Sequence, residues 1–144
     1  MGARRKSREL ALQILFQIDV GELSLEEVHS NFIETQNLQN EIKTFALELA
    51  EGTLKDIKNI DSIIEKTMDN WQISRLAAVD RNILRLATYE LFNRNDIPIS
   101  VTINEAIELA KDYSTEESGK FVNGILDKVK DSLLKGKAAS FVRK

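Results

Sequence analysis

One stretch near the middle of the chain, residues 73–92, predicts a helix that is apolar over about half of its circumference. Its apolar residues recur at the spacing of one broad helical face: Ile73, Leu76, Ala77, Val79, Ile83, Leu84, Leu86, Ala87 and Leu91. Because this face is wider than a surface helix needs, we expect the helix to lie at the centre of the fold. Two acids within the same arc, Asp80 and Glu90, need partners if they are buried. The opposite, cationic face, with Arg75, Arg81 and Arg85, is expected to point to solvent or to something else.

Shorter amphipathic segments occupy the rest of the chain. Capping patterns and apolar stripes predict helices over about residues 4–20, 24–35, 37–52 and 53–66, another that begins at residue 100, and a last one over residues 114–135. No window shows sustained alternation of apolar and polar residues. The sequence therefore predicts an all-α fold of about seven helices in two small packed bundles that share the central helix or its neighbours. We expect a single domain over residues 1–135 and a basic, flexible C-terminal tail over residues 136–144.

Composition narrows the class of protein. The 144 residues contain no Cys, and no apolar run approaches the length of a membrane span. We therefore expect a soluble protein of the cytoplasm that contacts no membrane. The net charge of −3 hides basic ends, since residues 4–8 hold four Lys or Arg and residues 128–144 hold six against one Asp. Basic ends on an acidic body indicate a polyanionic partner that is bound locally, although a solubility role for the C-terminal tail remains open.

The residues that catalysis requires are missing from the sequence. There is no Cys, His29 is the only histidine, and the glycines match neither a P-loop nor a dinucleotide-binding fingerprint. Glu90, Glu105 and Glu108 would resemble a carboxylate metal centre, but such a centre in a helical bundle also needs histidine ligands. We therefore predict a protein that is not an enzyme and that binds no cofactor or metal.

The first helical turn carries the clearest signal for binding. Arg4, Arg5, Lys6 and Arg8 cover most sides of this turn, which suits phosphates better than a single bidentate target. The helix macrodipole disfavours four cations at a helix N-terminus, so we expect a bound anion to compensate for them.

Three aromatic or small residues are ambiguous from the pattern alone. Lys120 and Phe121 pair a cation with an aromatic ring that is able to stack on an unpaired base, whereas periodicity favours a core position for Phe121. Gly124, inside the last helix, predicts close approach of another helix or of a ligand. Phe16 lies off the apolar stripe of the first helix, and it belongs either to a second core layer or to a partner contact.

Several segments together resemble the bacterial NusB family of transcription antitermination factors. They occur in the family's order: RRKSRELA at 4–11, RLAAVDRNILR at 75–85 with Tyr89–Glu90–Leu91, Ile97–Pro98, INEAIELAK at 103–111 and KFVNGILD at 120–127. The resemblance covers nearly the whole chain, and its last two segments are the most specific.

The resemblance implies an all-helical protein that binds the single-stranded boxA element of ribosomal RNA leader transcripts. It also implies a joint complex with NusE, a small-subunit ribosomal protein, and with NusA and NusG on RNA polymerase, which prevents early termination. The expected RNA-binding residues are Arg4, Arg5, Lys6, Arg8, Lys120 and Phe121, and the expected partner-binding residues are Phe16, Asp80 and Glu117. Phe16 stands where the family often has tyrosine, so the tyrosine hydroxyl, which can hydrogen-bond to NusE, is missing at this position. A homodimer is also compatible with the family and would cover the same faces.

Two other interpretations remain open at this point. One is an RNA-binding domain cut from an rRNA methyltransferase. The chain length disfavours this interpretation, because no room is left for a methyl-donor site, unless a downstream domain was cut off. The other is a helical protein-interaction module that never contacts RNA. The salt dependence of RNA binding separates the protein-interaction module from an RNA-binding antitermination factor, since several phosphate contacts make the affinity for RNA fall steeply with salt.

Overall fold

The computed structural model describes residues 2–143, with side chains for residues 2–136, and all regular structure in this range is helical. Its α-helices are α1 (Ala3–Gly21), α2 (Leu25–Val28), α3 (Asn40–Lys55), α4 (Ile57–Glu65), α5 (Ala78–Asn93), α6 (Ile99–Tyr113) and α7 (Glu116–Arg143). A π-helical turn, η1 (His29–Ile33), follows α2, and a 3-10 turn, η2 (Ile73–Arg75), precedes α5. The predicted all-α fold with about seven helices is confirmed.

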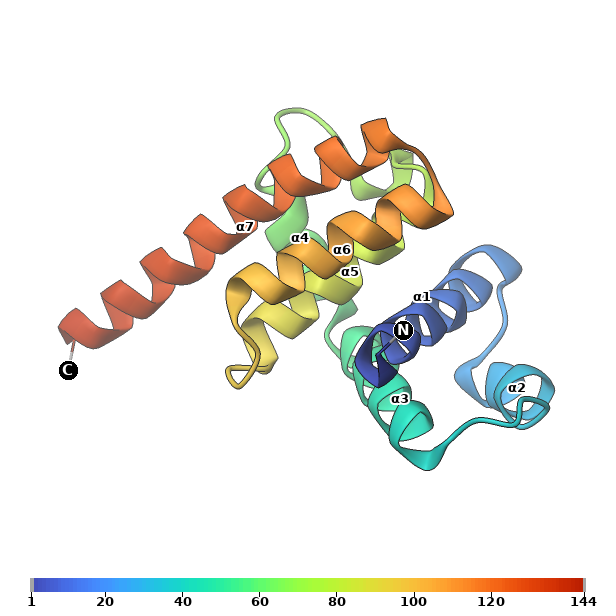
Figure 1. Cartoon of the computed structure of the whole chain (residues 1–144). Coiled ribbons are helices and arrows are strands. Elements are labelled where there is room, and N and C mark those ends of the chain that lie inside the picture. The colour runs from blue at the N-terminus through green and yellow to red at the C-terminus, as the bar shows by residue number, and fades with distance from the viewer. Residues whose placement is uncertain (1, 144) are drawn as a thin grey trace.

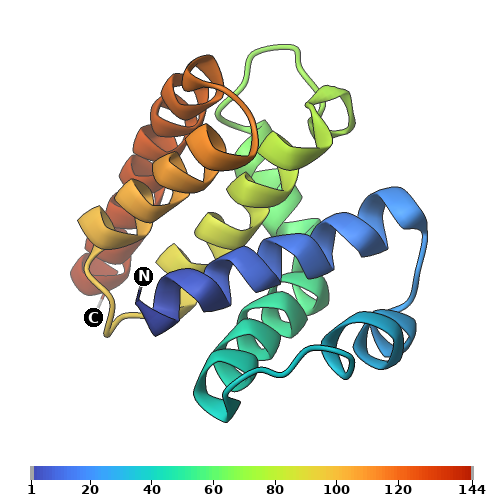
Figure 2. The same cartoon turned by 45° about the vertical axis from the view of Figure 1, so that its right-hand side comes forward.

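Helix α5 lies at the centre of the molecule. It packs against α1, α3, α4, α6 and α7, so each of the other long helices contacts it. Figures 1 and 2 show α1 and α3 on one side of α5 and the α6–α7 pair on the other. This arrangement confirms the prediction of two small bundles, and the element that they share is the central helix α5.

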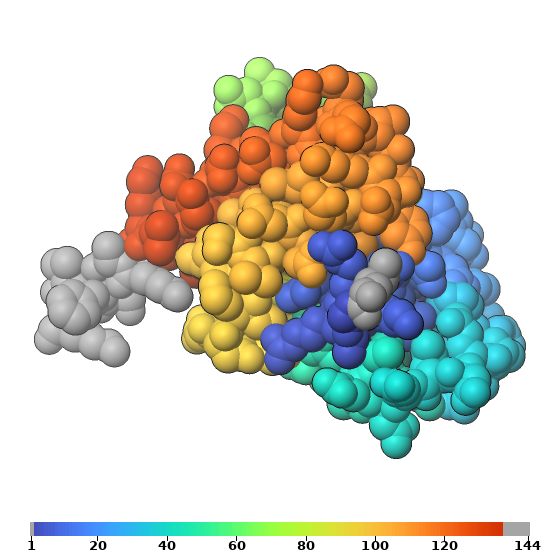
Figure 3. All heavy atoms as spheres, in the orientation of Figure 1, coloured from blue at the N-terminus to red at the C-terminus, as the bar shows by residue number. Residues whose placement is uncertain are grey.

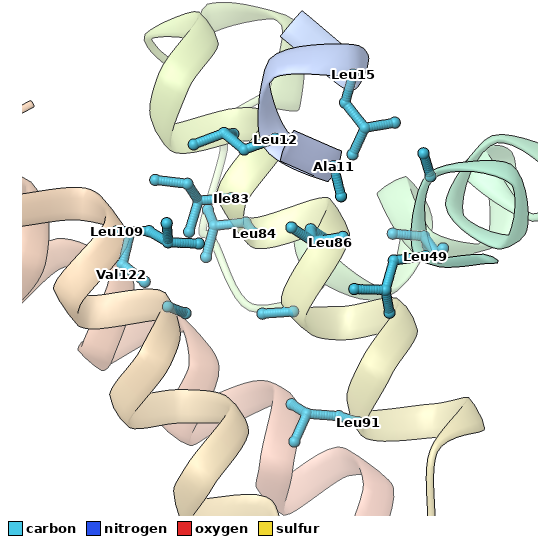
Figure 4. Packing of buried hydrophobic residues seen from close by; sticks show 14 of the residues in the cluster. Ala11, Leu12, Leu15, Leu49, Ile83, Leu84, Leu86, Leu91, Leu109 and Val122 are labelled. Carbon is cyan, nitrogen blue, oxygen red and sulfur yellow. The ribbon is translucent and has the colours of Figure 1, made fainter. Parts of the chain in front are cut away.

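The core forms where five helices converge on α5. Figure 4 shows Leu84 and Leu86 of α5 between Ala11 and Leu15 of α1 on one side and Leu109 of α6 on the other. The labelled side chains in this figure, which include Leu49 of α3 and Val122 of α7, are all less than a tenth exposed. The apolar stripes that the sequence predicts on separate helices therefore meet in one continuous core.

The central helix begins later than its apolar pattern indicates. Leu76 and Ala77 are extended, with ψ near 152° and 139°, so Ile73–Arg75 is a separate turn and α5 starts at Ala78. The predicted start at Ile73 is wrong. Ile73 is buried, but it belongs to the segment that precedes α5, and apolar spacing reports burial without showing whether the backbone is helical. Asp80 consequently lies in the first turn of α5, where the helix macrodipole favours an acid.

The cationic face of α5 is turned inward rather than toward solvent. Arg81 Nε donates to Asp19 at 2.8 Å, and Arg85 Nε donates to Asp61 at 2.8 Å. Asn82 Nδ2 also donates to Asp19, at 2.9 Å. Partial burial raises the pKa of Asp19, but the bonds from Asn82 and Arg81 outweigh it and the net shift is downward. These ion pairs tie α5 to the end of α1 and to α4. Of the two alternatives for the cationic face, Arg81 and Arg85 therefore contact other parts of the chain, whereas Arg75 is exposed to solvent.

Two helix starts show how side chains cap the backbone. Ser24 Oγ accepts the N–H of Glu27, and the Glu27 carboxylate accepts the N–H of Ser24, which confirms the predicted capping box. At the start of α7, Thr115 Oγ accepts the N–H of Ser118 at 3.0 Å. The cap of α7 is therefore Thr115, one residue later than the predicted Ser114.

Helix α3 differs from its prediction at both ends. It begins at Asn40, and not at a cap on Asn37, and it continues to Lys55, so that Gly52 lies inside the helix. A Cβ atom on Gly52 would overlap the ring of Tyr89. Gly52 therefore serves the close approach of α5 to α3 and does not terminate α3.

The backbone of α7 continues into the C-terminal segment. It is helical to Arg143, whereas the sequence predicts a flexible basic tail from residue 136. The side chains of residues 137–144 lie outside the described part, and the division of the chain at residue 135 stays a prediction. Within the described part, no helix is both long and apolar enough to span a membrane.

Candidate functional site

The first turn of α1 presents its four cations in different environments. Arg4 and Lys6 are exposed, Arg5 is half-buried, and Arg8 is buried. Figure 3 shows this turn, in blue, at the surface between α6 above it and α3 below it. Only part of the predicted basic cluster is therefore accessible to a ligand.

Arg4 is held in place by an aromatic ring. Its guanidinium carbon lies 4.9 Å from the ring centroid of Phe45 on α3, and the guanidinium carbon of Arg94 lies 5.0 Å from the same ring. Arg94 is also bound to Glu48 and Asp96, whereas no ion pair of Arg4 occurs within the described residues. The stacking fixes the guanidinium of Arg4 while its N–H groups remain available for an anion.

Arg8 belongs to a buried ion-pair network. Its Nε donates to Glu90 Oε2 at 3.1 Å, and a second N–H of its guanidinium donates to Glu90 Oε1. Thr102 Oγ1 donates to the same carboxylate at 2.9 Å. A carboxylate oxygen of Glu105, Oε1, lies 3.6 Å from a guanidinium nitrogen of Arg8. The side chains of Arg8 and Glu90 are 5% and 2% exposed. Arg8 therefore does not reach the surface, and we correct its assignment as a direct RNA contact.

This network also explains how α1 tolerates positive charge at its start. Glu105 of α6 binds Arg5 as well as Arg8, and this hydrogen-bonded ion pair raises the pKa of Arg5. Glu105 and Glu90 together supply two negative charges to the first turn of α1. The compensation that we expected from a bound anion thus comes in part from the chain itself, which leaves Arg4 and Lys6 as the exposed cations.

A second group of candidate residues lies on the first turns of α7. Lys120 is exposed, and Phe121 is 36% exposed although periodicity favours a core position. The buried stripe of α7 is formed by its neighbours Val122, Ile125, Leu126, Val129 and Leu133, and Phe121 lies beside that stripe. The ring is therefore accessible for stacking, as the family resemblance implies.

Gly124 faces open space. A Cβ atom there would meet no described atom within 4 Å, so the close helix approach that we predicted is wrong within this chain. One helical turn before Gly124, Lys120 Nζ lies 3.5 Å from Glu117 Oε1 in an exposed ion pair. No hydrogen bond or ion pair in the described part joins this α7 group to the first turn of α1.

Phe16 lines an apolar groove between α1, η1, α5 and α6. The groove has a volume of about 340 Å³, and its lining residues are Leu12, Gln13, Phe16, Gln17, Phe32, Val79 and Tyr113. Phe16 is 36% exposed, which resolves its ambiguity in favour of the surface, whereas its neighbour in the groove, Leu12, is buried in the core. The sequence pattern missed Tyr113, whose hydroxyl donates to Glu9 at 3.1 Å at the edge of α6.

Asp80 directly follows the groove residue Val79. It is half-buried, and its Oδ2 lies 3.5 Å from Ser118 Oγ at the start of α7. Its other oxygen, Oδ1, is buried and has no hydrogen-bond partner within the described residues. Glu117, the neighbour of Ser118, is exposed. An acid with unused hydrogen-bonding capacity thus lies where α5 and α7 begin, next to the apolar groove.

Two of the three carboxylates that resemble a metal centre in the sequence are bound to arginines. Glu90 and Glu105 both bind arginines of α1. No group of three or more His, Cys, Asp or Glu suited to a metal ion occurs among the residues with described side chains.

Comparison with known proteins gives concordant matches over most of the chain. The model of the NusB family matches residues 5–131. A protein from Desulforudis audaxviator named transcription antitermination protein NusB is 48% identical over 126 residues, covering 88% of this chain and 91% of the relative. One of the same name from Desulfitobacterium hafniense is 51% identical over 135 residues, covering 92% and 91%.

Solved structures are similar in fold as well as in sequence. T. maritima NusB is 43% identical, with a TM-score of 0.82, and the match covers 89% of this chain and 90% of that one. A crystal structure of the antitermination factors NusB and NusE in complex with dsRNA contains a chain that is 32% identical, with a TM-score of 0.83. This match covers 92% of the present chain and 98% of that one.

Proposed function

Since this chain belongs to the NusB family of transcription antitermination factors, we propose that it binds the boxA RNA of ribosomal RNA leader transcripts jointly with NusE. In this proposal the joint complex acts in the cytoplasm, on RNA polymerase and together with NusA and NusG. The protein is a binding factor and carries no catalytic step of its own.

The observation that carries the RNA part of the proposal is the pair of exposed groups on α1 and α7. Arg4 and Lys6 offer unburied positive charge for phosphates, and Phe121 offers a partly exposed ring beside Lys120. An aromatic face stacks only on a base that has been freed from pairing, so the structure favours single-stranded RNA for this chain. A related NusB is known in a complex with NusE and dsRNA, which supports RNA as the class of ligand.

The groove at Phe16 is the proposed NusE surface. An apolar side chain of the partner fits against Phe16 and Val79, and a basic side chain of the partner satisfies Asp80, whose Oδ1 lacks a hydrogen bond within the described residues. Glu117, exposed beside Ser118, extends this acidic edge. A second copy of the chain would compete for the same groove, so a homodimer and the NusE complex would exclude each other.

Charge and stacking variants test the RNA surface separately. Replacing Arg4 and Lys6 together with alanine should weaken binding of a short boxA RNA and flatten the dependence of log K on log salt by about 0.7 per lost phosphate contact. Replacing Phe121 with leucine should weaken binding by about 1–3 kcal/mol and leave the salt slope unchanged, because no charge is removed. Fluorescence anisotropy of labelled RNA at several salt concentrations measures both quantities.

Lys58 provides a matched control. It is exposed on α4, and Lys58→Ala removes one charge without touching either candidate group. This variant should bind as the wild type does. If the Arg4 and Lys6 variant keeps the wild-type salt slope, or if Lys58→Ala changes it equally, the first turn of α1 is not the phosphate-binding surface.

A further inference from the structure

The segment that joins α4 to α5 exposes the only tryptophan of the chain. Trp71 is 47% exposed, the most exposed of the large aromatic side chains with a described environment. The segment around it is anchored: Ile73 is buried, and its N–H donates to the Glu65 carboxylate at 2.9 Å. The 3-10 turn that follows is closed by a bond from the N–H of Arg75 to the carbonyl of Gln72 at 3.0 Å. Trp71 is thus presented to solvent from a fixed backbone.

Arg75 supplies a cation beside the exposed ring. Its guanidinium carbon lies 5.4 Å from the ring centroid of Trp71, and the side chain is exposed. No ion pair or side-chain hydrogen bond of Arg75 occurs among the described residues. An indole face with an adjacent, uncommitted guanidinium offers both of the interactions that single-stranded nucleic acids use, which are base stacking and phosphate binding.

This segment runs alongside the first half of α7. Lys128 Nζ of α7 donates to the carbonyl of Thr67 at 3.3 Å, and Ser118 of α7 is in contact with Asp80 beyond the far end of the segment. Figures 1 and 2 both show the light-green segment beside the beginning of α7. Phe121 is two helical turns from Lys128 and on the same side of α7. Phe121, which is partly exposed, therefore lies on the side of α7 from which Lys128 reaches the start of the Trp71 segment at Thr67.

The surroundings of the segment are polar and carry more cations than anions. A surface hollow of about 440 Å³ next to it is lined by Lys66, Lys128 and Lys135, against Asp69 and Asp131. Tryptophan and arginine are also common in protein hot spots, but those lie in apolar, well-packed pockets, and the hollow beside Trp71 is not of that kind. The charge of this surface favours RNA over an apolar protein partner.

We propose that Trp71 and Arg75 form a second stacking platform for the RNA, continuing the site at Phe121. This inference rests on the proposed function, because it extends the path of the same single strand. One base stacks on Phe121, a later base stacks on Trp71, and Arg75 binds a phosphate of the backbone near it. Gly124 lies on α7 between Phe121 and Lys128, and it has no side chain and faces open space. It therefore leaves this part of the α7 surface unobstructed.

Because Trp71 is the only tryptophan, its fluorescence reports on this site directly. The full-length chain is titrated with a short single-stranded boxA RNA while tryptophan emission is recorded, and binding is measured in parallel by the anisotropy of labelled RNA. Stacking of a base on Trp71 should quench the emission with the same midpoint as the anisotropy curve. Trp71→Ala should lower the affinity about tenfold, and Trp71→Phe should retain most of it because a ring remains. Arg75→Ala should flatten the salt slope by about 0.7.

The outcomes separate this inference from the proposed function. If the RNA binds by anisotropy while the emission is unchanged and Trp71→Ala binds as the wild type does, the second platform is wrong and the proposed function stands. If emission responds to NusE alone and not to RNA, Trp71 belongs to a protein interface and the platform is again wrong. If the wild type binds no RNA, with or without NusE, both proposals are overturned. Circular dichroism of the Trp71 and Arg75 variants, whose side chains are exposed, should match the wild type.

Discussion

Replacing Arg8 with methionine while Glu90 stays in place is expected to lower the free energy of unfolding by about 3–5 kcal/mol. The carboxylate of Glu90 is 2% exposed and would keep only its hydrogen bond from Thr102. A buried charge without its partner pays the desolvation cost with no compensating attraction. Urea unfolding, followed by the helical circular dichroism signal, measures this loss.

Two further variants distinguish charge burial from other causes. The double variant Arg8→Met with Glu90→Met removes both charges, and it should recover most of the lost stability because an apolar pair of similar size needs no compensation. Arg5→Met breaks the ion pair between Arg5 and Glu105. Because the Arg5 side chain is 37% exposed, solvent screening should keep the loss of stability below about 1 kcal/mol. A double variant as unstable as Arg8→Met would show that the network contributes through something other than its charges.

The second large effect concerns Gly52. Glycine to alanine in a helix interior normally stabilises a protein by up to about 1 kcal/mol. Here the added Cβ atom would overlap the ring of Tyr89, so Gly52→Ala should instead destabilise the protein by about 1–3 kcal/mol, as overpacking does. Thermal and urea unfolding of the single variant test the sign directly.

Gly124 gives a matched comparison because it is also a helical glycine. A Cβ atom at this position meets no described atom within 4 Å, so Gly124→Ala should stabilise the protein by up to about 1 kcal/mol. Removing the Tyr89 ring in the background of Gly52→Ala should cost less than removing it from the wild type, since the overlap disappears with the ring. Equal effects of the two glycine substitutions would rule out the close approach between α3 and α5.

The helices could be predicted from the sequence because the information for them is local. Apolar stripes and the Ser24 capping box identified most elements, and the width of one stripe identified α5 as central. The start of α5 could not be found in this way. The apolar spacing continues through Ile73, although Leu76 and Ala77 are extended, so the stripe reports burial and not backbone conformation.

The environment of charged side chains was the part that the sequence could not supply. Four neighbouring cations on α1 look alike in the sequence, and only the fold brings Glu90, 82 residues away, against Arg8. Arg81 and Arg85 were likewise turned inward by Asp19 and Asp61, from other helices. Conversely, Phe121 fits a core stripe by spacing yet lies beside it. Long-range contacts decide which candidate residues remain free to bind.

The most direct test of the central claim is the affinity for a short single-stranded boxA RNA and for a scrambled RNA, each with and without NusE. The account predicts a preference for boxA that tightens when NusE is present and weakens steeply with salt. Asp80→Lys should remove most of the tightening by NusE while leaving the circular dichroism spectrum unchanged. Equal or absent binding of both RNAs, even with NusE, would contradict the account and would indicate a helical protein-interaction module instead.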